Sequence, residues 1–261
     1  MTDKEKVHLY DRLNWAHHYG TFLTQKFNTE KRFGLEGCDS FIPGLKVAID
    51  AAAENGASHF VIGMPHRGRL NVLVNVVRKP LEVVFAELQG IKPTKSEEFA
   101  HKFADTGDVK YHLGTTYKRL QTMTDGSQKH VSITLLPNPS HLEAVNPVVM
   151  GRARAMQHTF GGGDQSRKEV VPIIIHGDAA MAGQGVVYEQ LQMQSLDNYR
   201  VGGTIHVVVN NQVGFTTNPS KGRSGVYATD VGKSINAPVF HVNADSMEDV
   251  QRTFKFAAEL R

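Results

Sequence analysis

The chain has 261 residues, 40% of them hydrophobic, and its 29 Lys and Arg against 26 Asp and Glu give a formal charge of +3. This composition is ordinary for a globular chain and excludes a disordered, collagen-like or coiled-coil protein. The length allows one large domain or two small ones, and a single core of this size buries about three quarters of the unfolded chain's surface.

The charge pattern and the cysteine content limit the partners and the cellular compartment that we expect for this protein. Basic and acidic residues are interleaved along the chain, which argues against a nucleic-acid-binding surface. Residues 1–11 carry charges where a secretory signal needs an apolar run, and no stretch approaches the roughly 18 apolar residues of a membrane span. The single cysteine, Cys38, cannot form an internal disulfide. We expect a soluble, unexported protein in a reducing compartment that binds neither nucleic acid nor a membrane.

The first part of the chain predicts helices on either side of a short strand. Residues 11–27 have a loosely helical spacing of apolar side chains and predict a leading helix. In 41–53 the apolar residues recur every three or four positions, which predicts a buried helix. The apolar run 60–62 predicts a strand, and a second helical pattern follows at 70–77. The polar segment 92–110 predicts a surface excursion.

The middle of the chain predicts one more strand and one more helix. An apolar run at 131–136 predicts the strand. Ser140 and Glu143 have the spacing of a capping box, in which each side chain binds the backbone amide of the other residue. We therefore expect them to open a helix that runs towards Met156.

The last part contains the clearest strands. Residues 170–175 and 204–209 are apolar and rich in β-branched side chains, which is typical of strands covered on both faces, with a helix-length segment between them. A further apolar run, 239–242, predicts another strand before a helix at 246–258. Because strands and helices alternate, the sequence predicts an α/β fold: a doubly wound, mainly parallel sheet with helices on both faces.

Polar side chains follow four of the expected strands. In open α/β sheets, ligands bind at the carboxyl ends of the strands, so these positions are the candidate site. They are His66, Arg67, Arg69, Asn138, Ser140, His141, Gly177, Asp178, Asn210, Asn211 and Gln212.

Asp178 and Asn211 indicate the kind of ligand. Asp178 follows a buried strand, and the small side chains of Ala179 and Ala180 let a diphosphate approach the backbone and the N-terminus of the next helix. Asn211 follows the neighbouring strand. A carboxylate, an amide oxygen and a nearby backbone carbonyl are ligands that Mg²⁺ prefers, and phosphates and water complete its shell. The residues therefore predict a diphosphate held by magnesium.

Two segments resemble the thiamine diphosphate motif: HGDAAMAGQGVVYE (176–189) and VVVNNQVGFTT (207–217), with Gly-Asp-Ala where the general motif begins Gly-Asp-Gly. Further segments resemble motifs of the same family and occur along the chain in the same order as in that family: GMPHRGRLNVL (63–73), GDVKYHLG (107–114), NPSHLEAVNPVVMG (138–151) and APVFHVNAD (237–245). From about Arg32 to its end, the chain resembles the decarboxylating first component of 2-oxoglutarate dehydrogenase complexes.

The resemblance implies a thiamine diphosphate-binding, transketolase-like fold and a set of site residues. The implied magnesium ligands are Asp178, Asn211 and the carbonyl of Val213. His66 and His112 are the implied catalytic residues that face the 2-oxo acid. The implied cofactor contacts are Arg67, Ser140, Leu142, Asp178, Ala179, Ala180, Asn211 and Val213.

The resemblance also implies a reaction and partners. The family decarboxylates 2-oxoglutarate oxidatively and passes the succinyl group to a lipoyl-bearing succinyltransferase. Its members are homodimers within a multienzyme complex of the tricarboxylic acid cycle. The implied compartment is the mitochondrial matrix in a eukaryote and the cytoplasm in a bacterium.

In this family a second, later domain completes the site and carries the glutamate that activates the cofactor. No segment of this chain matches that domain. We therefore expect a fragment, with little or no turnover alone. Its expected parts are a helical lead-in, 1–35, and a diphosphate-binding α/β domain, 36–261, that is incomplete at its C-terminus.

Other functions remain as alternatives. A homologue specific for 2-oxoadipate differs by one methylene of substrate, which the sequence does not resolve. A non-catalytic interaction module could retain the cofactor fold. A zinc hydrolase built from His66, His112, His141 and Asp178 lacks the short helical spacing of such sites, and Gly183 with Gly185 lacks the third glycine of a nicotinamide-binding motif.

Overall fold

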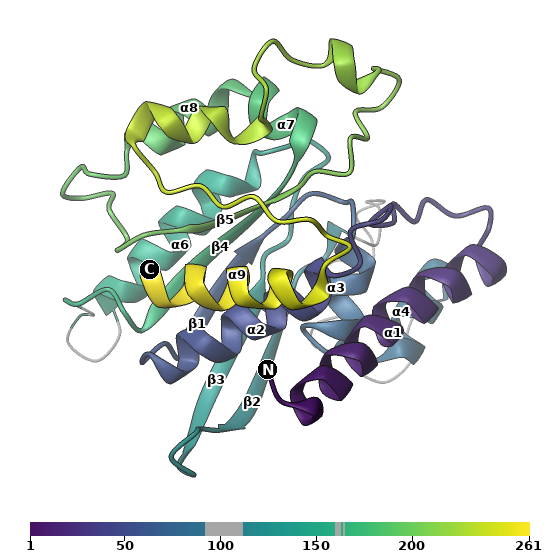
Figure 1. Ribbon diagram of the computed structural model, residues 1–261, viewed down its shortest axis with the longest axis horizontal. Coiled ribbons are helices and arrows are strands. Elements are labelled where there is room, and N and C mark those ends of the chain that lie inside the picture. The colour runs from purple at the N-terminus through teal and green to yellow at the C-terminus, as the bar shows by residue number, and fades with distance from the viewer. Residues whose placement is uncertain (92–111, 160–162, 164) are drawn as a thin grey trace.

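A five-stranded sheet lies at the centre of the described part of the chain, which in the computed structural model comprises residues 1–91, 112–159, 163 and 165–261 (Figure 1). The strand order is β2–β3–β1–β4–β5. β1 pairs in parallel with β3 and β4, β5 pairs in parallel with β4, and β2 pairs antiparallel to β3. The strands are β1 (His59–Gly63), β2 (Thr115–Thr122), β3 (Gln128–Leu135), β4 (Val170–Gly177) and β5 (Ile205–Val209). The predicted mainly parallel α/β sheet is confirmed.

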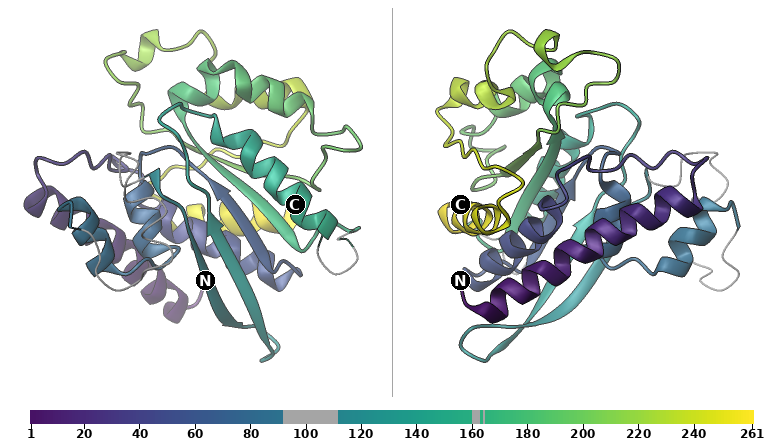
Figure 2. Two further views of the ribbon diagram at one scale, coloured as in Figure 1. Left: turned by 180° about the vertical axis from the view of Figure 1, so that it is seen from behind. Right: turned by 45° about the vertical axis from the view of Figure 1, so that its right-hand side comes forward.

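Helices cover both faces of this sheet. Figure 1 shows α2 and α9 in front of it, and the view from behind in Figure 2 shows α6 on the opposite face. The α-helices are α1 (Asp3–Lys26), α2 (Phe41–Glu54), α3 (Arg69–Asn75), α4 (Leu81–Leu88), α6 (Val145–Thr159), α7 (Asp178–Gly183), α8 (Gly185–Gln192) and α9 (Met247–Leu260). Two 3₁₀ helices, η2 (Pro219–Lys221) and η3 (Ala228–Ile235), lie between β5 and α9.

The alternation of side chains along β1 explains how one strand serves two cores. Phe60 and Ile62 belong to the larger apolar cluster with α2, whereas Val61 packs with Val149 of α6 in a separate cluster. A Cβ on Gly63 would lie only 2.4 Å from Cγ2 of Val149. Glycine at the last position of β1 therefore permits the close approach of α6, which fixes where the next residues leave the sheet.

The predicted capping box at Ser140 and Glu143 is wrong, because α6 begins at Val145. Pro147 explains the later start. It lies in the first turn of α6, where no backbone N–H has to be donated. A helix opened by Ser140 would place the proline in its interior, where the missing N–H and the ring disrupt the helix. The turn that contains Glu143 therefore lies outside the helix, and the Glu143 side chain contacts other residues.

The predicted strand at 239–242 is also not formed. This segment pairs with no strand among the described residues and instead lines a cavity of about 770 Å³ together with β5. Residues of both segments line this cavity, and Val239 and Phe240 stay 37% and 39% exposed. Without backbone partners, an apolar run is extended chain and not a strand.

Three further outcomes concern single segments. The helix at 246–258 is confirmed as α9, whose Ser246 hydroxyl donates to Asp249 at 2.6 Å. No described helix is long and apolar enough to cross a membrane. The predicted surface excursion at 92–110 lies outside the described residues, as do residues 107–111 of the motif 107–114.

Candidate active site

The carboxyl ends of the parallel strands meet at one edge of the sheet. Gly63 of β1 is in register with Ile174 of β4, and Gly177 of β4 is in register with Val209 of β5. The amide of Leu136, just after β3, donates to Ile62 at 2.9 Å. The segments that follow these strands therefore leave the sheet side by side, as the strand-end argument predicted.

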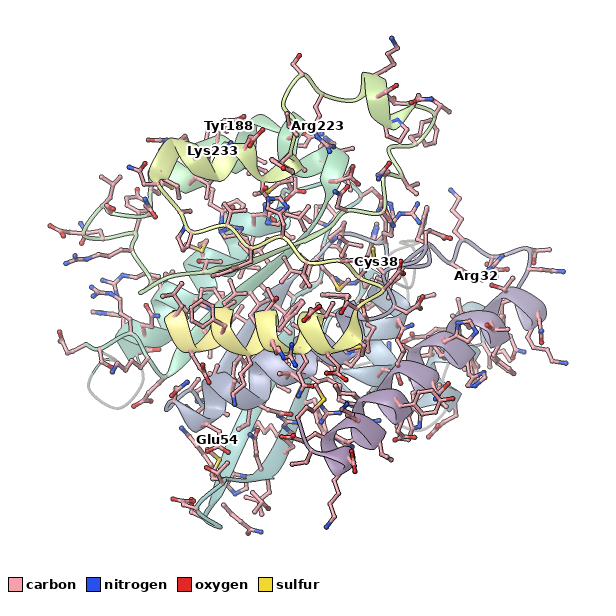
Figure 3. All side chains as sticks on the ribbon, viewed as in Figure 1. Arg32, Cys38, Glu54, Tyr188, Arg223 and Lys233 are labelled. Atoms are coloured by element: carbon pink, nitrogen blue, oxygen red, sulfur yellow. The ribbon has the colours of Figure 1, made fainter. Side chains whose placement is uncertain are left out.

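Asp178 is a buried carboxylate at this edge. It is the first residue of α7, and its side chain is only 5% exposed. Its Oδ2 accepts a hydrogen bond from Nη1 of Arg223 at 3.3 Å, and Figure 3 labels Arg223 next to α7. Its Oδ1 is buried and has no hydrogen-bond partner among the described residues. A buried carboxylate oxygen without a donor is costly, and a cation would satisfy it.

The loop after β5 packs against the start of α7. A Cβ on Gly214 would lie 3.2 Å from the Cβ of Ala179, so the two segments touch. Within this loop, Oδ1 of Asn211 accepts a hydrogen bond from the amide of Val213 at 3.2 Å. That bond orders the turn and leaves a second lone pair on the same oxygen. The expected metal ligands are thus on two segments in contact.

The loop 33–36 makes hydrogen bonds to the segment after β1 and to the segment after β5. The amide of Gly68 donates to the carbonyl of Phe33 at 2.8 Å, and Nδ2 of Asn211 donates to the carbonyl of Leu35 at 3.0 Å. Gly68 has φ +75°, and a Cβ there would lie 2.4 Å from the Leu35 side chain. Only glycine adopts this backbone conformation without strain, and its lack of a side chain lets Leu35 pack directly against it.

Arg67 is bound to the same loop. Its Nη1 donates to the carbonyl of Gly34 at 3.1 Å and lies 3.4 Å from Oε1 of Glu36. The guanidinium carbon lies 6.0 Å from the centre of the Phe33 ring. Because Glu36 is half exposed, this ion pair is weak and an anionic ligand can compete for the guanidinium.

Two histidines lie at the edge between β1 and β3. The His66 ring is 4.2 Å from the Phe33 ring, centroid to centroid, and Oγ of Ser140 is 3.5 Å from Nε2 of the buried His112. Burial, and then the nearby Arg67 and His112, lower the pKa of His66. The His66 imidazole is therefore neutral at pH 7 and can both donate and accept a proton.

Arg69 holds the strand ends in place. Its side chain is fully buried, and it donates hydrogen bonds to the carbonyls of Met64, His112, Leu113 and Leu136 at 2.6–3.4 Å. Burial lowers the pKa of Arg69 to about 9, so the guanidinium stays charged at neutral pH. The position of Arg69 directly before the helical apolar pattern of 70–77 was the available signal for burial.

Behind the edge, Glu143 and two histidines form a chain of hydrogen bonds that is buried at Glu143 and His176 and partly buried at His206. Oε2 of Glu143 is 2.6 Å from Nδ1 of His176 and accepts from Nδ2 of Asn146 at 2.6 Å. Nε2 of His176 is 2.9 Å from Nδ1 of His206. The sequence alone does not predict these contacts. The chain ties the turn before α6 to β4 and β5.

The other predicted residues differ in exposure. Ala180 is buried, Ala179 and Ser140 are exposed, and Leu142 and Val213 are 36% and 39% exposed. Exposure of Ala179 leaves room beside the backbone at the start of α7. Arg223, which is not among the predicted site residues, makes a direct contact with Asp178.

The oxygen atoms of Asp178 and Asn211 suit a magnesium ion that also binds a diphosphate, and do not suit a metal held by protein side chains alone. Among the described residues, no three His, Cys, Asp or Glu side chains come together as metal ligands, so the zinc hydrolase alternative gains no support. Asp178 offers an unpartnered buried oxygen, and Asn211 offers an amide oxygen in the adjoining loop. A cation with only a few protein ligands needs others from its substrate, as Mg²⁺ does.

Comparison with known families defines the class of this chain. Residues 13–261 match the family described as Dehydrogenase E1 component. The chain belongs to this family.

Individual relatives are similar over the full chain. It is 53% identical over 261 residues to a protein of Dictyostelium discoideum named 2-oxoglutarate dehydrogenase, mitochondrial, and covers 25% of that protein. It is 48% identical to the protein of the same name from Schizosaccharomyces pombe, over 98% of the chain and 24% of the relative. It is also 48% identical to a 2-oxoglutarate dehydrogenase-like, mitochondrial protein of Pongo abelii, with 25% of that protein covered. The chain thus spans about a quarter of the length of these relatives.

Proposed function

We propose that this chain forms the diphosphate-binding part of a thiamine diphosphate-dependent 2-oxo acid dehydrogenase. The observation that carries the proposal is the unpartnered oxygen of buried Asp178 at the end of β4, in contact range of the loop that bears Asn211. Membership of the Dehydrogenase E1 component family supports the same cofactor class. The division into a lead-in, 1–35, and a diphosphate-binding domain, 36–261, is part of this proposal.

In this proposal Asp178, Asn211 and the carbonyl of Val213 hold Mg²⁺, which in turn binds the diphosphate. Ala179 and Ala180 leave the backbone of α7 open to the phosphates. Arg67 exchanges its contact with the half-exposed Glu36 for the more highly charged ligand. Ser140 and Leu142 line the cofactor from the segment after β3.

His66 and His112 face the 2-oxo acid. When bound, thiamine diphosphate supplies the carbon nucleophile and the electron sink that decarboxylation requires. His66, kept neutral by its lowered pKa, can donate a hydrogen bond to the substrate carboxylate or hold a proton at one ring nitrogen. His112 is held by Arg69 through its carbonyl and by Ser140 through its ring, which orients the imidazole.

The whole enzyme, in this proposal, oxidatively decarboxylates 2-oxoglutarate and passes the succinyl group to a lipoyl-bearing succinyltransferase as a homodimer in a multienzyme complex. The names of the relatives support 2-oxoglutarate as substrate and the mitochondrial matrix as compartment. The alternative substrate is 2-oxoadipate, since one methylene is worth only about 1–3 kcal/mol. Because the chain spans a quarter of its relatives' length, we expect little or no turnover from it alone.

The test is carbon dioxide release by the full-length protein that carries this chain, with 2-oxoglutarate and 2-oxoadipate as competing substrates. His66→Ala and His112→Ala should each lower kcat/KM by about a hundredfold or more, the range of lost acid–base assistance. His158→Ala, at an exposed position of α6, is the matched control and should leave the rate unchanged. Full activity of the His66 and His112 variants, or full activity of the isolated chain, would contradict the proposal.

A further inference from the structure

A second cavity, of about 230 Å³, lies between α1, α2 and β2 and shares no residue with the candidate active site. Figure 1 shows α2 in front of the sheet and α1 beside α2. The cavity is lined by cations from four separate segments: Arg12 of α1, Lys46 of α2, Arg78 after α3 and Arg119 of β2. Convergence of cations from distant parts of the sequence is unfavourable unless an anion is present.

The carboxylates around this cavity do not balance its cations. Asp50 accepts hydrogen bonds from Arg12, at 3.4 Å, and from Arg119. Asp11 lines the cavity as a second carboxylate. With Lys46 protonated, four cations against two carboxylates leave an excess of two positive charges.

Lys46 is the least compensated of these cations. The residue is only 7% exposed, in a helix that is buried on nearly every side. In the part of the chain that the structure describes, its ammonium makes no hydrogen bond or ion pair. Burial, and then the charges of Arg12 and Arg78, lower the pKa of Lys46 to about 7. An ammonium that lines the cavity on a mostly buried residue, without a protein partner, fits an anion-binding position, because a bound anion would favour its charged form.

The arginines around the cavity also retain unused donors. The Nε groups of Arg12 and Arg119 are buried and have no hydrogen-bond partner among the described residues. Arg78 places its guanidinium carbon 4.9 Å from the centre of the Trp15 ring, and Trp15 forms part of the cavity wall. Guanidinium forks suit the oxygens of a phosphate, and a lysine adds a point charge.

We propose that this cavity binds a dianionic phosphoryl group, either inorganic phosphate or the phosphate of a small phosphomonoester. The excess of two positive charges matches a dianion, and the cavity volume admits one phosphate with little else. Trp15 offers a flat apolar wall to a short organic substituent. The site is separate from the proposed diphosphate site and does not depend on it.

The experiment is a calorimetric titration of the chain with inorganic phosphate and with glycerol 3-phosphate, in a buffer without other multivalent anions. We expect one equivalent to bind. Lys46→Met and Arg78→Gln should each weaken binding about tenfold or more, the loss expected for one charge-assisted hydrogen bond. Lys118→Met removes the same charge from an exposed position of β2 and should leave binding unchanged. Tighter binding of glycerol 3-phosphate identifies an organic phosphate as the ligand, and equal or tighter binding of phosphate identifies the free ion.

Thermal unfolding gives an independent readout that also verifies the fold of the variants. Phosphate should raise the Tm of the unsubstituted chain and of Lys118→Met, but not that of Lys46→Met. In phosphate-free buffer Lys46→Met should itself have the higher Tm, because a buried charge is removed. No phosphate binding by the unsubstituted chain, or binding that Lys46→Met leaves intact, would overturn the proposal.

Discussion

Arg223 donates a hydrogen bond from Nη1 to Oδ2 of Asp178 across 3.3 Å, and this contact joins the loop after β5 to the start of α7. Without a metal, the arginine supplies the only positive charge in contact with that carboxylate among the described residues. The contact therefore neutralises one oxygen of Asp178 while Oδ1 stays without a donor. We infer that the loop around Arg223 and the magnesium compete for the same carboxylate.

Replacement of Arg223 by glutamine should destabilise the metal-free chain. Asp178 would then be buried without a charged partner, which costs about 2 kcal/mol in the free energy of unfolding. Urea unfolding in EDTA measures this loss, and Mg²⁺ should recover part of it because Arg223 no longer competes. Arg200→Gln breaks an exposed ion pair with Asp197 and is the control, with a change of less than about 0.5 kcal/mol. Equal stabilities of the two variants would contradict this role of Arg223.

Glu143 should be important for stability and not for capping α6. Glu143→Ala removes the acceptor of His176 and Asn146 from a buried site, so we expect a loss of about 3 kcal/mol in urea unfolding. Glu143 has φ +68°, a conformation that glycine adopts without strain. Glu143→Gly should therefore be about 1 kcal/mol more stable than Glu143→Ala. If both variants unfold like the unsubstituted chain, the buried contacts contribute nothing.

The partly buried His206 should make stability depend on pH. Burial, and then His176, lower the pKa of His206 to about 3, whereas in the unfolded chain it stays near 6.5. Below pH 6.5 the unfolded state binds a proton that the folded state does not. Stability is therefore complete above pH 6.5 and falls towards pH 3, by up to about 1.4 kcal/mol per pH unit.

Urea unfolding between pH 7 and pH 4 checks this dependence on His206. His206→Asn keeps a polar partner for His176 and should flatten the slope over that range. His158→Asn, at an exposed site, should not. A slope that His206→Asn leaves unchanged would place the responsible proton elsewhere.

Arg69 should be required for the geometry around His112. Arg69→Leu leaves the carbonyls of Met64, His112, Leu113 and Leu136 without its donors, and we expect more than about 3 kcal/mol of destabilisation. Arg252→Leu on the exposed face of α9 is the control. Native-state hydrogen exchange of the amides after β1 and β3 would show the loss locally, and unchanged protection there would refute the assignment.

The buried parallel strands can be predicted from the sequence because both faces of each strand are covered by other parts of the protein. Residues of β4 are covered on both faces, so an apolar, β-branched run is enough to identify them. β2 escaped prediction because its side chains alternate between exposed and half-buried and are mostly polar. Its pairing with β3 depends on a partner and not on its own pattern.

The candidate site is predictable in its strand-end residues and not in its loops. Asp178 and Asn211 follow strands, so strand position places them at one edge. The contact of Arg223 with Asp178 depends on how a long loop folds back, which no local pattern records. The helix start predicted at Ser140 was wrong because Pro147 would then lie in the helix interior. The strand predicted at 239–242 was wrong because that segment has no strand to pair with among the described residues.

The most direct test of the central claim is the affinity of thiamine diphosphate for the full-length protein, measured by calorimetry with Mg²⁺ and with EDTA. We predict binding that requires magnesium, that Asp178→Ala abolishes and that Asp197→Ala, an exposed aspartate after α8, leaves intact. Binding of equal strength in Asp178→Ala, or binding that EDTA does not weaken, would contradict a diphosphate site at the ends of β4 and β5.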